Sequence, residues 1–331
     1  MDEITKKVID MYSLYPYPFP TSSRKKTNEL LNLLRIFSIE NRYEFDGKSV
    51  LDAGTGTGHR LMQAASFYKN SNFIAIDYSQ HSVNIAKELA LKQNVSNVNF
   101  KIKNLMNDLS DLGRFEVILC MGVLHHLSDP KVGLQNLCSI LHDNGLLFLY
   151  VYGKLGGHQR MIQKKIVSLL IGNSKKKYEK GVKLVKELKF DNLEYGWNLD
   201  IENENEKNAL IVDAFLHANE NLYDFDDLDR LMKCSGLYGY CIFGITTKKI
   251  GLLFDTQIDP KIRIPASLAN INNITKSTYI LEAYQKLDLK DRCRILELFY
   301  EPNGYTIVGL TKQMYESLDV ESRIKNNLIL C

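Results

Sequence analysis

Short apolar runs alternate with amphipathic segments along the first half of the chain. The predicted strands cover residues 49–53, 73–77, 98–103, 115–121 and 146–152, and the last of them is apolar throughout, as in a strand buried on both faces. Between the strands, apolar residues recur three or four positions apart, which predicts helices at 60–68, 82–93 and 131–141. This alternation predicts an α/β fold with a mostly parallel sheet and helices on both faces.

The rest of the chain shows the pattern less regularly. Helices are predicted at 2–14, 24–39, 159–172, 175–190 and 224–234, with two more within 277–300. Strands are predicted at 237–246 and 305–311, the latter as a seventh strand antiparallel beside the sixth. Asp143-Asn144-Gly145 is typical of a helix stop, and the polar stretch 191–208 of a connector.

Composition narrows the class of protein. The 331 residues are 45% hydrophobic and 24% charged, which is ordinary for a globular protein. A net charge of +3 is too small to indicate a nucleic-acid partner. The six cysteines lack C-x-x-C spacing, which favours reduced thiols, and no apolar run reaches the ~18 residues of a membrane span. With no N-terminal signal visible, we expect a cytoplasmic protein without membrane segments.

The strongest local signal is a glycine turn after the first predicted strand, in the sequence SVLDAGTGTGH at 49–59. Glycine serves where backbone takes a positive φ or approaches a ligand closely, so strand, turn and helix predict a nucleotide-binding corner. A dinucleotide fingerprint needs a third small residue where this chain has His59, which argues against a pyrophosphate. Asp77 ends the second strand, 19 residues after Gly58, and is placed to accept hydrogen bonds from ribose hydroxyls; a helix N-terminal role is the alternative.

Four segments together carry a family resemblance. VLDAGTGTG, IAIDYS, FEVILCMGVLHHLSDP and LHDNGLLFLYVYG stand in the order of the class I S-adenosylmethionine (SAM) methyltransferases, which the region 45–155 resembles. The resemblance implies a Rossmann-like seven-stranded sheet with added helices, and SAM as the cofactor. It implies cofactor contacts at Asp52, Gly54, Gly56, Gly58, Asp77, Tyr78, Asn104, Leu105, Cys120 and Gly122.

Two further resemblances are shorter. Tyr-Pro-Tyr-Pro at 15–18 is similar to an element ahead of the glycine turn in one subgroup of these methyltransferases. That subgroup also has an Asp-x-x-Leu-His element, which suggests that Asp213 and His217 line an acceptor pocket; a helix cap and a surface histidine are the alternatives. PYPFP-T resembles the start of bacterial outer-membrane-protein lysine methyltransferases. Three prolines make 15–20 an extended segment, either a lid over the site or a strap packed on the domain.

The predicted domains are N-terminal helices and the Tyr/Pro-rich segment (1–44), the SAM-binding core (45–155), a helical insertion over the acceptor site (156–222), and the remaining strands with C-terminal helices (223–331). The catalytic candidates are His125, His126, His158 and Tyr17. For the adjacent His125 and His126 the alternative is a structural hydrogen bond, and for His158 it is a place in a surface turn. Tyr150, Tyr152 and Arg160 are further acceptor-site candidates. No metal ligand cluster is apparent.

The predicted function is methyl transfer from SAM to an unidentified acceptor. The small net charge and the helical cover favour a small molecule. A protein side chain such as lysine, and an inactive SAM-binding partner protein, remain alternatives. The chain has no Asn-Pro-Pro-Tyr after the fourth strand, which disfavours an amino-methylating DNA enzyme. The oligomeric state stays open.

Overall fold

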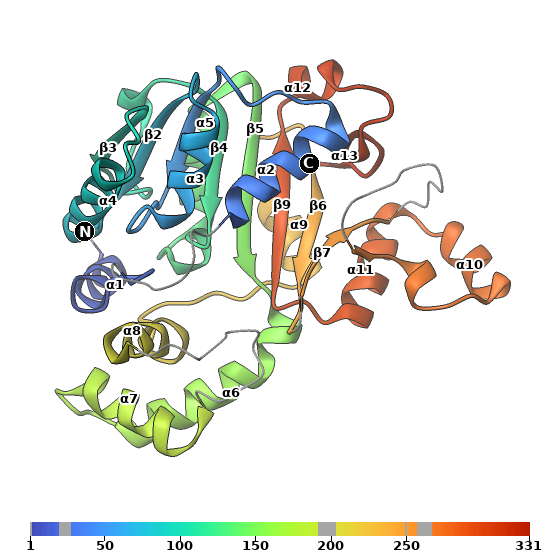
Figure 1. Cartoon of the computed structure of the whole chain (residues 1–331). Helices are drawn as coiled ribbons and strands as arrows, with labels where there is room; N and C mark the ends of the chain where they lie inside the picture. The colour runs from blue at the N-terminus through green and yellow to red at the C-terminus, as the bar shows by residue number, and fades with distance from the viewer. Residues whose placement is uncertain (1, 20–27, 191–202, 249, 257–266) are drawn as a thin grey trace.

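The computed structural model describes residues 2–19, 28–190, 203–248, 250–256 and 267–331. These form a ten-stranded sheet with helices on both faces (Figure 1). The strands in spatial order are β3 (Val98–Ile102), β2 (Asn72–Asp77), β1 (Ser49–Ala53), β4 (Phe115–Met121), β5 (Leu141–Tyr152), β9 (Gly304–Leu310), β6 (Gly239–Thr246), β7 (Gly251–Phe254) and β8 (Leu268–Ala269), with β10 (Ile329–Leu330) paired to β6.

The first five strands run parallel, which confirms the predicted α/β class. β9 lies between β5 and β6 and is antiparallel to both, so the predicted antiparallel seventh strand is confirmed. The described part of the sheet exceeds the predicted seven strands because the short strands β7, β8 and β10 extend it beyond β6.

Alternate strand residues reach two hydrophobic cores, one on each face of the sheet. On one face Val50 and Phe148 pack with α2 (Glu29–Asn41), α3 (His59–Phe67), α4 (Gln80–Lys92), α12 (Lys312–Ser317) and α13 (Arg323–Asn326). On the other face Leu51 and Leu149 pack with α5 (Pro130–Ser139), α9 (Phe225–Lys233), α10 (Thr278–Gln285) and α11 (Leu289–Tyr300). The central strands β1 and β4 are thereby buried on both sides, as expected for inner strands of a parallel sheet.

A third cluster lies beyond the carboxyl ends of the parallel strands. There α1 (Glu3–Leu14) packs with α6 (Lys154–Ile171), α7 (Lys177–Glu187) and α8 (Glu204–Phe215) (Figure 1). Met11 of α1 is fully buried among Val167, Val185 and Ile211. The N-terminal helix is therefore held by the insertion that follows β5, on the edge of the sheet where ligands bind in open α/β folds.

Three sequence predictions need correction. The helix after β4 ends at Ser139, and Asp143-Asn144-Gly145 lies within β5, at a shift in the register with β4. Within the predicted connector 191–208, residues 191–202 lie outside the described residues, while α8 begins at Glu204 behind an Asn203 side-chain cap. The helix predicted from residue 24 begins at Glu29, and 20–27 lie outside the described residues.

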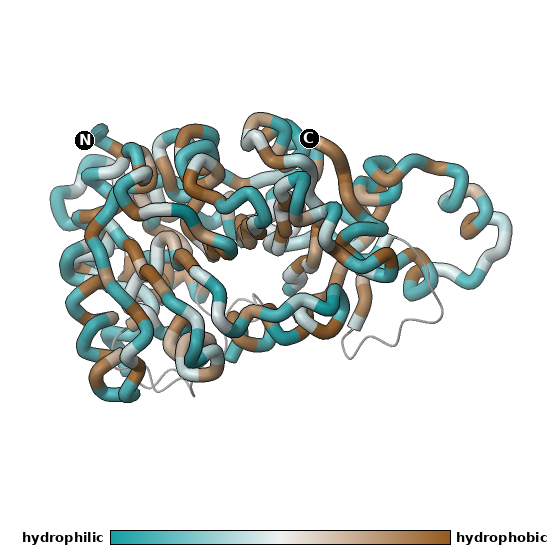
Figure 2. Tube along the Cα trace, turned by 90° about the horizontal axis from the view of Figure 1, so that it is seen from above, coloured by the Kyte–Doolittle hydropathy of each residue, from teal (hydrophilic) through white to brown (hydrophobic). Residues whose placement is uncertain are grey.

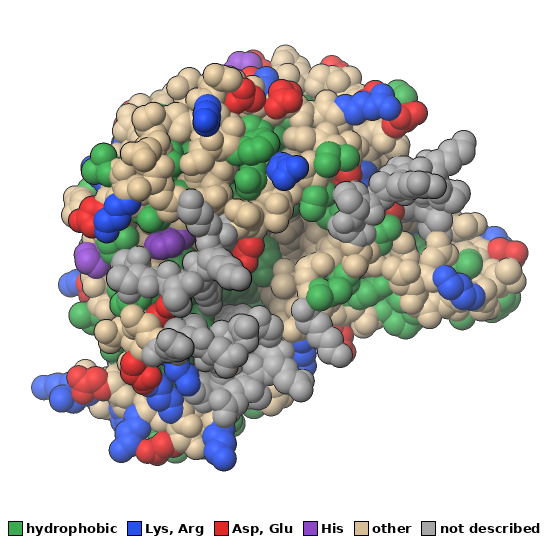
Figure 3. All heavy atoms as spheres, in the orientation of Figure 1, with side chains coloured by type: hydrophobic (Ala, Val, Ile, Leu, Met, Phe, Trp, Pro, Cys, Tyr) green, Lys and Arg blue, Asp and Glu red, His purple; other side chains and the backbone are tan. Residues whose placement is uncertain are grey.

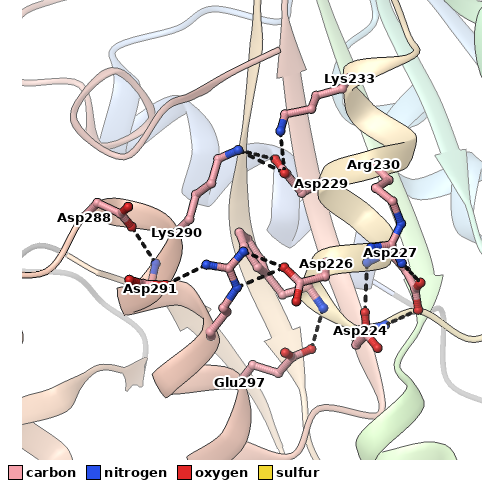
Figure 4. Close-up of polar contacts among 12 residues, drawn as sticks. Asp224, Asp226, Asp227, Asp229, Arg230, Lys233, Asp288, Lys290, Asp291 and Glu297 are labelled. Carbon is pink, nitrogen blue, oxygen red and sulfur yellow. Dashed lines mark hydrogen bonds and ion pairs between the residues drawn. The ribbon is translucent and has the colours of Figure 1, made fainter.

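Two surface features are distinct from the site. The arm formed by α10 and α11 projects from the body in both views (Figures 1 and 2). Where α9 meets α11, the carboxylate of Asp229 binds Lys290 of α11 (Figure 4). The same carboxylate accepts hydrogen bonds from Lys233 and Tyr240. Basic and acidic side chains mix over the α7 region (Figure 3), as in the Lys183–Glu187 pair, which is typical of a solvated face. No helix in the described ranges has the length and apolar character needed to cross a bilayer.

Candidate active site

The glycine turn between β1 and α3 accepts no side chain at two of its positions. Gly54 has φ +81°, and an added Cβ would lie 2.3 Å from a methyl group of Val123. Gly56 has φ +56°, and an added Cβ would lie 3.0 Å from the carbonyl oxygen of Tyr17. The turn therefore needs glycine both for its backbone conformation and for its contact with the Tyr/Pro-rich segment.

Asp77, at the end of β2, holds the turn and lines the cavity beside it. Its carboxylate accepts the N–H of Gly56 at 2.9 Å and the N–H of Ser79 at 2.8 Å. Burial raises the pKa of this carboxyl, while the hydrogen bonds from these amides act in the opposite direction. Each carboxylate oxygen retains a lone pair for a ligand hydroxyl.

Asp52 and Arg60 add an acidic and a basic group to the cavity close to the turn. Asp52 is the fourth residue of β1, and burial raises its pKa to about 6 despite opposing contributions from Thr55 and Arg60. Arg60, in the first turn of α3, donates to the carbonyl oxygen of Met121 at 2.8 Å. Its guanidinium has further N–H groups for a carboxylate. Arg60 was not predicted from the sequence, where the signal is a basic residue two positions after the last glycine of the turn.

The other predicted cofactor residues divide into two groups. Tyr78, Asn104, Leu105 and Gly122 line the cavity together with Asp52, Gly54, Gly56 and Asp77. The side-chain oxygen of Asn104 accepts the N–H of Met106 at 3.0 Å, which fixes the amide in the cavity wall. Cys120 is fully buried within β4 and Gly58 lies behind the turn against Ala86, so neither lines the cavity.

The opposite wall contains hydrogen bonds between segments far apart in sequence. Tyr12 of α1 donates to Oδ1 of Asp213 at 2.9 Å, and Nε2 of His217 lies 3.1 Å from the same hydroxyl. The N–H of Asn219 lies 3.1 Å from Nδ1 of His217, and its carbonyl oxygen lies 2.9 Å from Nδ1 of His126. Tyr12, Asp213 and His126 line the cavity, whereas His217 lies directly behind them.

The four catalytic candidates occupy different places. His126 and Tyr17 line the cavity. His125 is fully buried beneath Tyr152, with ring centroids 4.0 Å apart, and no described residue hydrogen-bonds either of its ring nitrogens. Burial holds the pKa of His125 well below its usual range, so its ring packs as a neutral aromatic. His158 is exposed on α6 and does not reach the cavity.

Tyr150 and Tyr152, which were predicted as acceptor-site residues, line the cavity where β5 ends. Arg160 lies behind Tyr152, its guanidinium 5.3 Å from the ring centroid, and makes two hydrogen bonds to the buried Glu220 at 2.6 and 3.0 Å. Lys164 also binds Glu220 at 2.9 Å. The ion pairs therefore support the tyrosine wall from outside and leave the cavity side to aromatic rings.

His126, Asp213 and His217 offer potential metal-ligand atoms within 4.8 Å of one another. Their hydrogen bonds argue for a different arrangement. Both ring nitrogens of His217 are engaged, by Asn219 and by Tyr12, and its ring stacks on His126 with centroids 3.7 Å apart and planes 20° apart. Lone pairs on stacked, nearly parallel rings do not converge on one ion, so the geometry favours a hydrogen-bonded network over a metal site.

A single cavity joins the two walls. It runs from the glycine turn, Asp77 and Asn104 to His126 and Asp213, at the carboxyl ends of β1, β2 and β4. Residues of α1 and the segment that follows it form one side, namely Thr5, Val8, Ile9, Tyr12, Tyr17 and Pro18. Thr57 also donates to the carbonyl oxygen of Pro18 at 2.8 Å. The N-terminal segment therefore lies directly on the glycine turn; Pro20 lies outside the described residues.

Comparisons with known proteins agree with this fold. Residues 44–195 match the family described as a methyltransferase domain. The chain is similar to an uncharacterized protein of Synechococcus sp., with 28% identity over 253 residues, 71% of this chain and 59% of that protein. A ubiquinone biosynthesis O-methyltransferase of Coxiella burnetii is 30% identical over 127 residues, 38% of this chain and 53% of that enzyme.

Among solved structures, PKMT2 from Rickettsia typhi in complex with AdoHcy has a TM-score of 0.59 and 18% identity, covering 93% of this chain and 55% of that one. The chain thus spans between about half and three fifths of the length of these relatives. The fold is the Rossmann-like fold of the class I methyltransferases. That the chain belongs to the subgroup with the Tyr-Pro-Tyr-Pro element stays a prediction.

Proposed function

We propose that this protein transfers a methyl group from SAM to an acceptor that enters the cavity beside His126. The observation that carries the proposal is the single cavity that joins the glycine turn and Asp77 to the wall of His126 and Asp213. When bound, SAM supplies a methyl group already activated by its sulfonium. The protein then has to hold the acceptor in line with that methyl and keep water out.

The polar groups of the glycine-turn half fit the cofactor. Asp52 can bind the ammonium of its amino-acid part and Arg60 the carboxylate. Asp77 can accept the ribose hydroxyls, and Asn104 can hydrogen-bond the adenine edge. Asp52 and Arg60 would thus each face a ligand group of opposite charge.

The acceptor is proposed to be a small molecule, because α1, Tyr17 and Pro18, and Asp213 of α8 enclose the cavity. In this arrangement Tyr17 and Pro18 act as part of a lid. The insertion 156–222 supplies the acceptor wall through Asp213. His126 is the proposed base, and Tyr17 a residue that contacts the ligand.

Calorimetry with SAM, S-adenosylhomocysteine (SAH) and NAD tests the cofactor. We expect binding of the first two and none of NAD. Tight NAD binding without SAM binding would refute the proposal. Incubation of a cell extract with methyl-labelled SAM tests the acceptor: label in the small-molecule fraction is expected, and label in protein would identify a side-chain acceptor.

A further inference from the structure

The cavity wall opposite the glycine turn contains a chain of hydrogen bonds whose direction is fixed. A backbone N–H can only donate, so Nδ1 of His217 accepts from Asn219 and carries no proton. Burial holds the pKa of His217 well below its usual range, so the ring is neutral and its proton lies on Nε2. Nε2–H then donates to Tyr12, and the Tyr12 hydroxyl donates to Asp213. The chain ends on a carboxylate in the cavity wall.

The same reasoning fixes the proton of His126. A backbone carbonyl can only accept, so Nδ1–H of His126 donates to the carbonyl oxygen of Asn219 at 2.9 Å. The neutral ring then carries a lone pair on Nε2. His126 lines the cavity, and ring and carboxylate atoms of His126 and Asp213 lie within 4.8 Å of each other. The His126 ring and the Asp213 carboxylate therefore supply two hydrogen-bond acceptors to the same wall of the cavity.

The charged groups around His126 differ in how they are paired. Arg160 and Lys164 of α6 both bind Glu220. The hydrogen-bond donor to Asp213 among the described residues is instead the neutral hydroxyl of Tyr12. The other groups that face the ring are neutral, namely His125, His217 and Tyr152. Asp213 is thus the carboxylate available to balance a positive charge on His126.

This inference rests on the proposed methyl transfer and names the class of acceptor. We propose that His126 and Asp213 take up the proton of the methyl acceptor, and that Tyr12 and His217 are positioning residues that hold Asp213 beside the base. The acceptor is then a group that must give up a proton to accept the methyl: a hydroxyl, or an amine that enters protonated and loses that proton to His126 before its lone pair attacks. A hydroxyl instead passes its proton to Nε2 of His126 as its oxygen gains the methyl group. The electron pair of the broken C–S bond stays on sulfur, so atoms and charge balance.

The acid–base part of this site comes from three distant segments. His126 follows β4, Asp213 and His217 belong to α8 and the residues after it, and Tyr12 belongs to α1. Stacking of the two histidine rings at 3.7 Å disfavours a charge on both at once. His217 therefore stays neutral while His126 is protonated, which keeps the hydrogen bond from His217 to Tyr12 in place during the reaction.

The test compares two ligands that differ at the reacting centre. Sinefungin resembles SAM but carries an amino group where SAM carries the methyl, whereas SAH has no group there. Because the wall presents acceptors, we expect the intact chain to bind sinefungin at least ~10-fold more tightly than SAH by calorimetry. Asp213→Asn should reduce this preference by ~10-fold or more, and Tyr12→Phe by a few-fold, with the affinity for SAH unchanged in both.

Tyr15→Phe is the matched control, since Tyr15 ends the same helix but contacts Tyr178 instead of the cavity. Burial lowers the pKa of His126 from the ordinary value of 6.5, so the preference should also fall as the pH drops below that value and protonation of the ring removes an acceptor; this fall should weaken in Asp213→Asn. If both variants melt as the wild type and keep the full preference, the inference is wrong. It is also wrong if the protein retains stoichiometric zinc that Asp213→Asn loses. Failure to bind either ligand would instead overturn the proposed function. If Asp213→Asn is unstable, Tyr12→Phe decides.

Discussion

Replacing Asp77 tests the cofactor half of the site most directly. In the folded chain its carboxylate accepts two backbone N–H groups, from Gly56 at 2.9 Å and from Ser79 at 2.8 Å. Asp77→Ala leaves both amides without this partner and removes the proposed acceptor of the ribose hydroxyls. The substitution therefore has one effect on stability and a separate effect on binding.

The two effects differ in size and can be measured apart. A hydrogen bond to a charged group is worth about 1.5–3 kcal/mol, so loss of the ribose contact should weaken SAH binding by ~10- to 150-fold. Two amides left unpaired should lower the free energy of unfolding by ~2–4 kcal/mol, a loss that a chain of ordinary stability survives. Calorimetry measures the first effect and denaturant unfolding the second.

A modified ligand separates the ribose contact from a general loosening of the turn. SAH without its 2′- and 3′-hydroxyls should bind the wild type more weakly by a similar factor. Asp77→Ala should then cost little further affinity for this analogue, because the interaction is already absent. If Asp77→Ala binds SAH as tightly as the wild type does, the reasoning is refuted and Asp77 only orders the turn.

Three further outcomes are expected. Burial raises the pKa of Asp52 to about 6, and only the charged carboxylate would bind the ammonium of the cofactor. The affinity for SAH, measured by calorimetry, should therefore fall by up to ~10-fold per pH unit below about pH 6. In Asp52→Asn this fall should be absent. Deletion of residues 1–20 should abolish turnover and weaken SAM binding while the core still melts cooperatively; unchanged affinity would exclude a lid. At Asp229 burial raises the pKa, but hydrogen bonds from Lys233, Lys290 and Tyr240 outweigh it and hold the value at about 2. Because the pKa of Asp229 is lowered on folding, its contribution to the free energy of unfolding should be complete above about pH 4 and lost as the pH falls towards 2. Asp229→Asn should lower the free energy of unfolding, measured in urea at pH 7, by ~2 kcal/mol.

The cofactor half of the site was predictable because its determinants are local in sequence. A glycine turn between a strand and a helix fixes the positions of Gly54 and Gly56 within a few residues, and Asp77 follows from the length of one strand–helix–strand unit. Cys120 was misplaced because alternation along β4 turns its side chain into the sheet core, which a motif cannot indicate.

The acceptor half depends on contacts that the sequence does not specify locally. Tyr12 is an ordinary tyrosine on an amphipathic helix until α8 brings Asp213 against it. Asn219 connects His126 and His217 through its backbone, which gives no sequence signal. Asp143-Asn144-Gly145 does not end the preceding helix but lies in β5 at the register shift, where pairing with β4 passes from Phe115↔Leu141 to Val117↔Leu146.

The contact between Tyr12 and Asp213 joins residues that are 201 positions apart, and this separation sets an order of assembly during synthesis. The ribosome releases Tyr12 first, and its partner emerges only 201 residues later. Strands β1 to β4 end by Met121, so the cofactor corner can form while the N-terminal helix still lacks the surface that buries Met11. Closure of so long a loop is entropically costly and belongs to a late step. A nascent chain stalled before α8 would hold a cofactor corner without an acceptor wall.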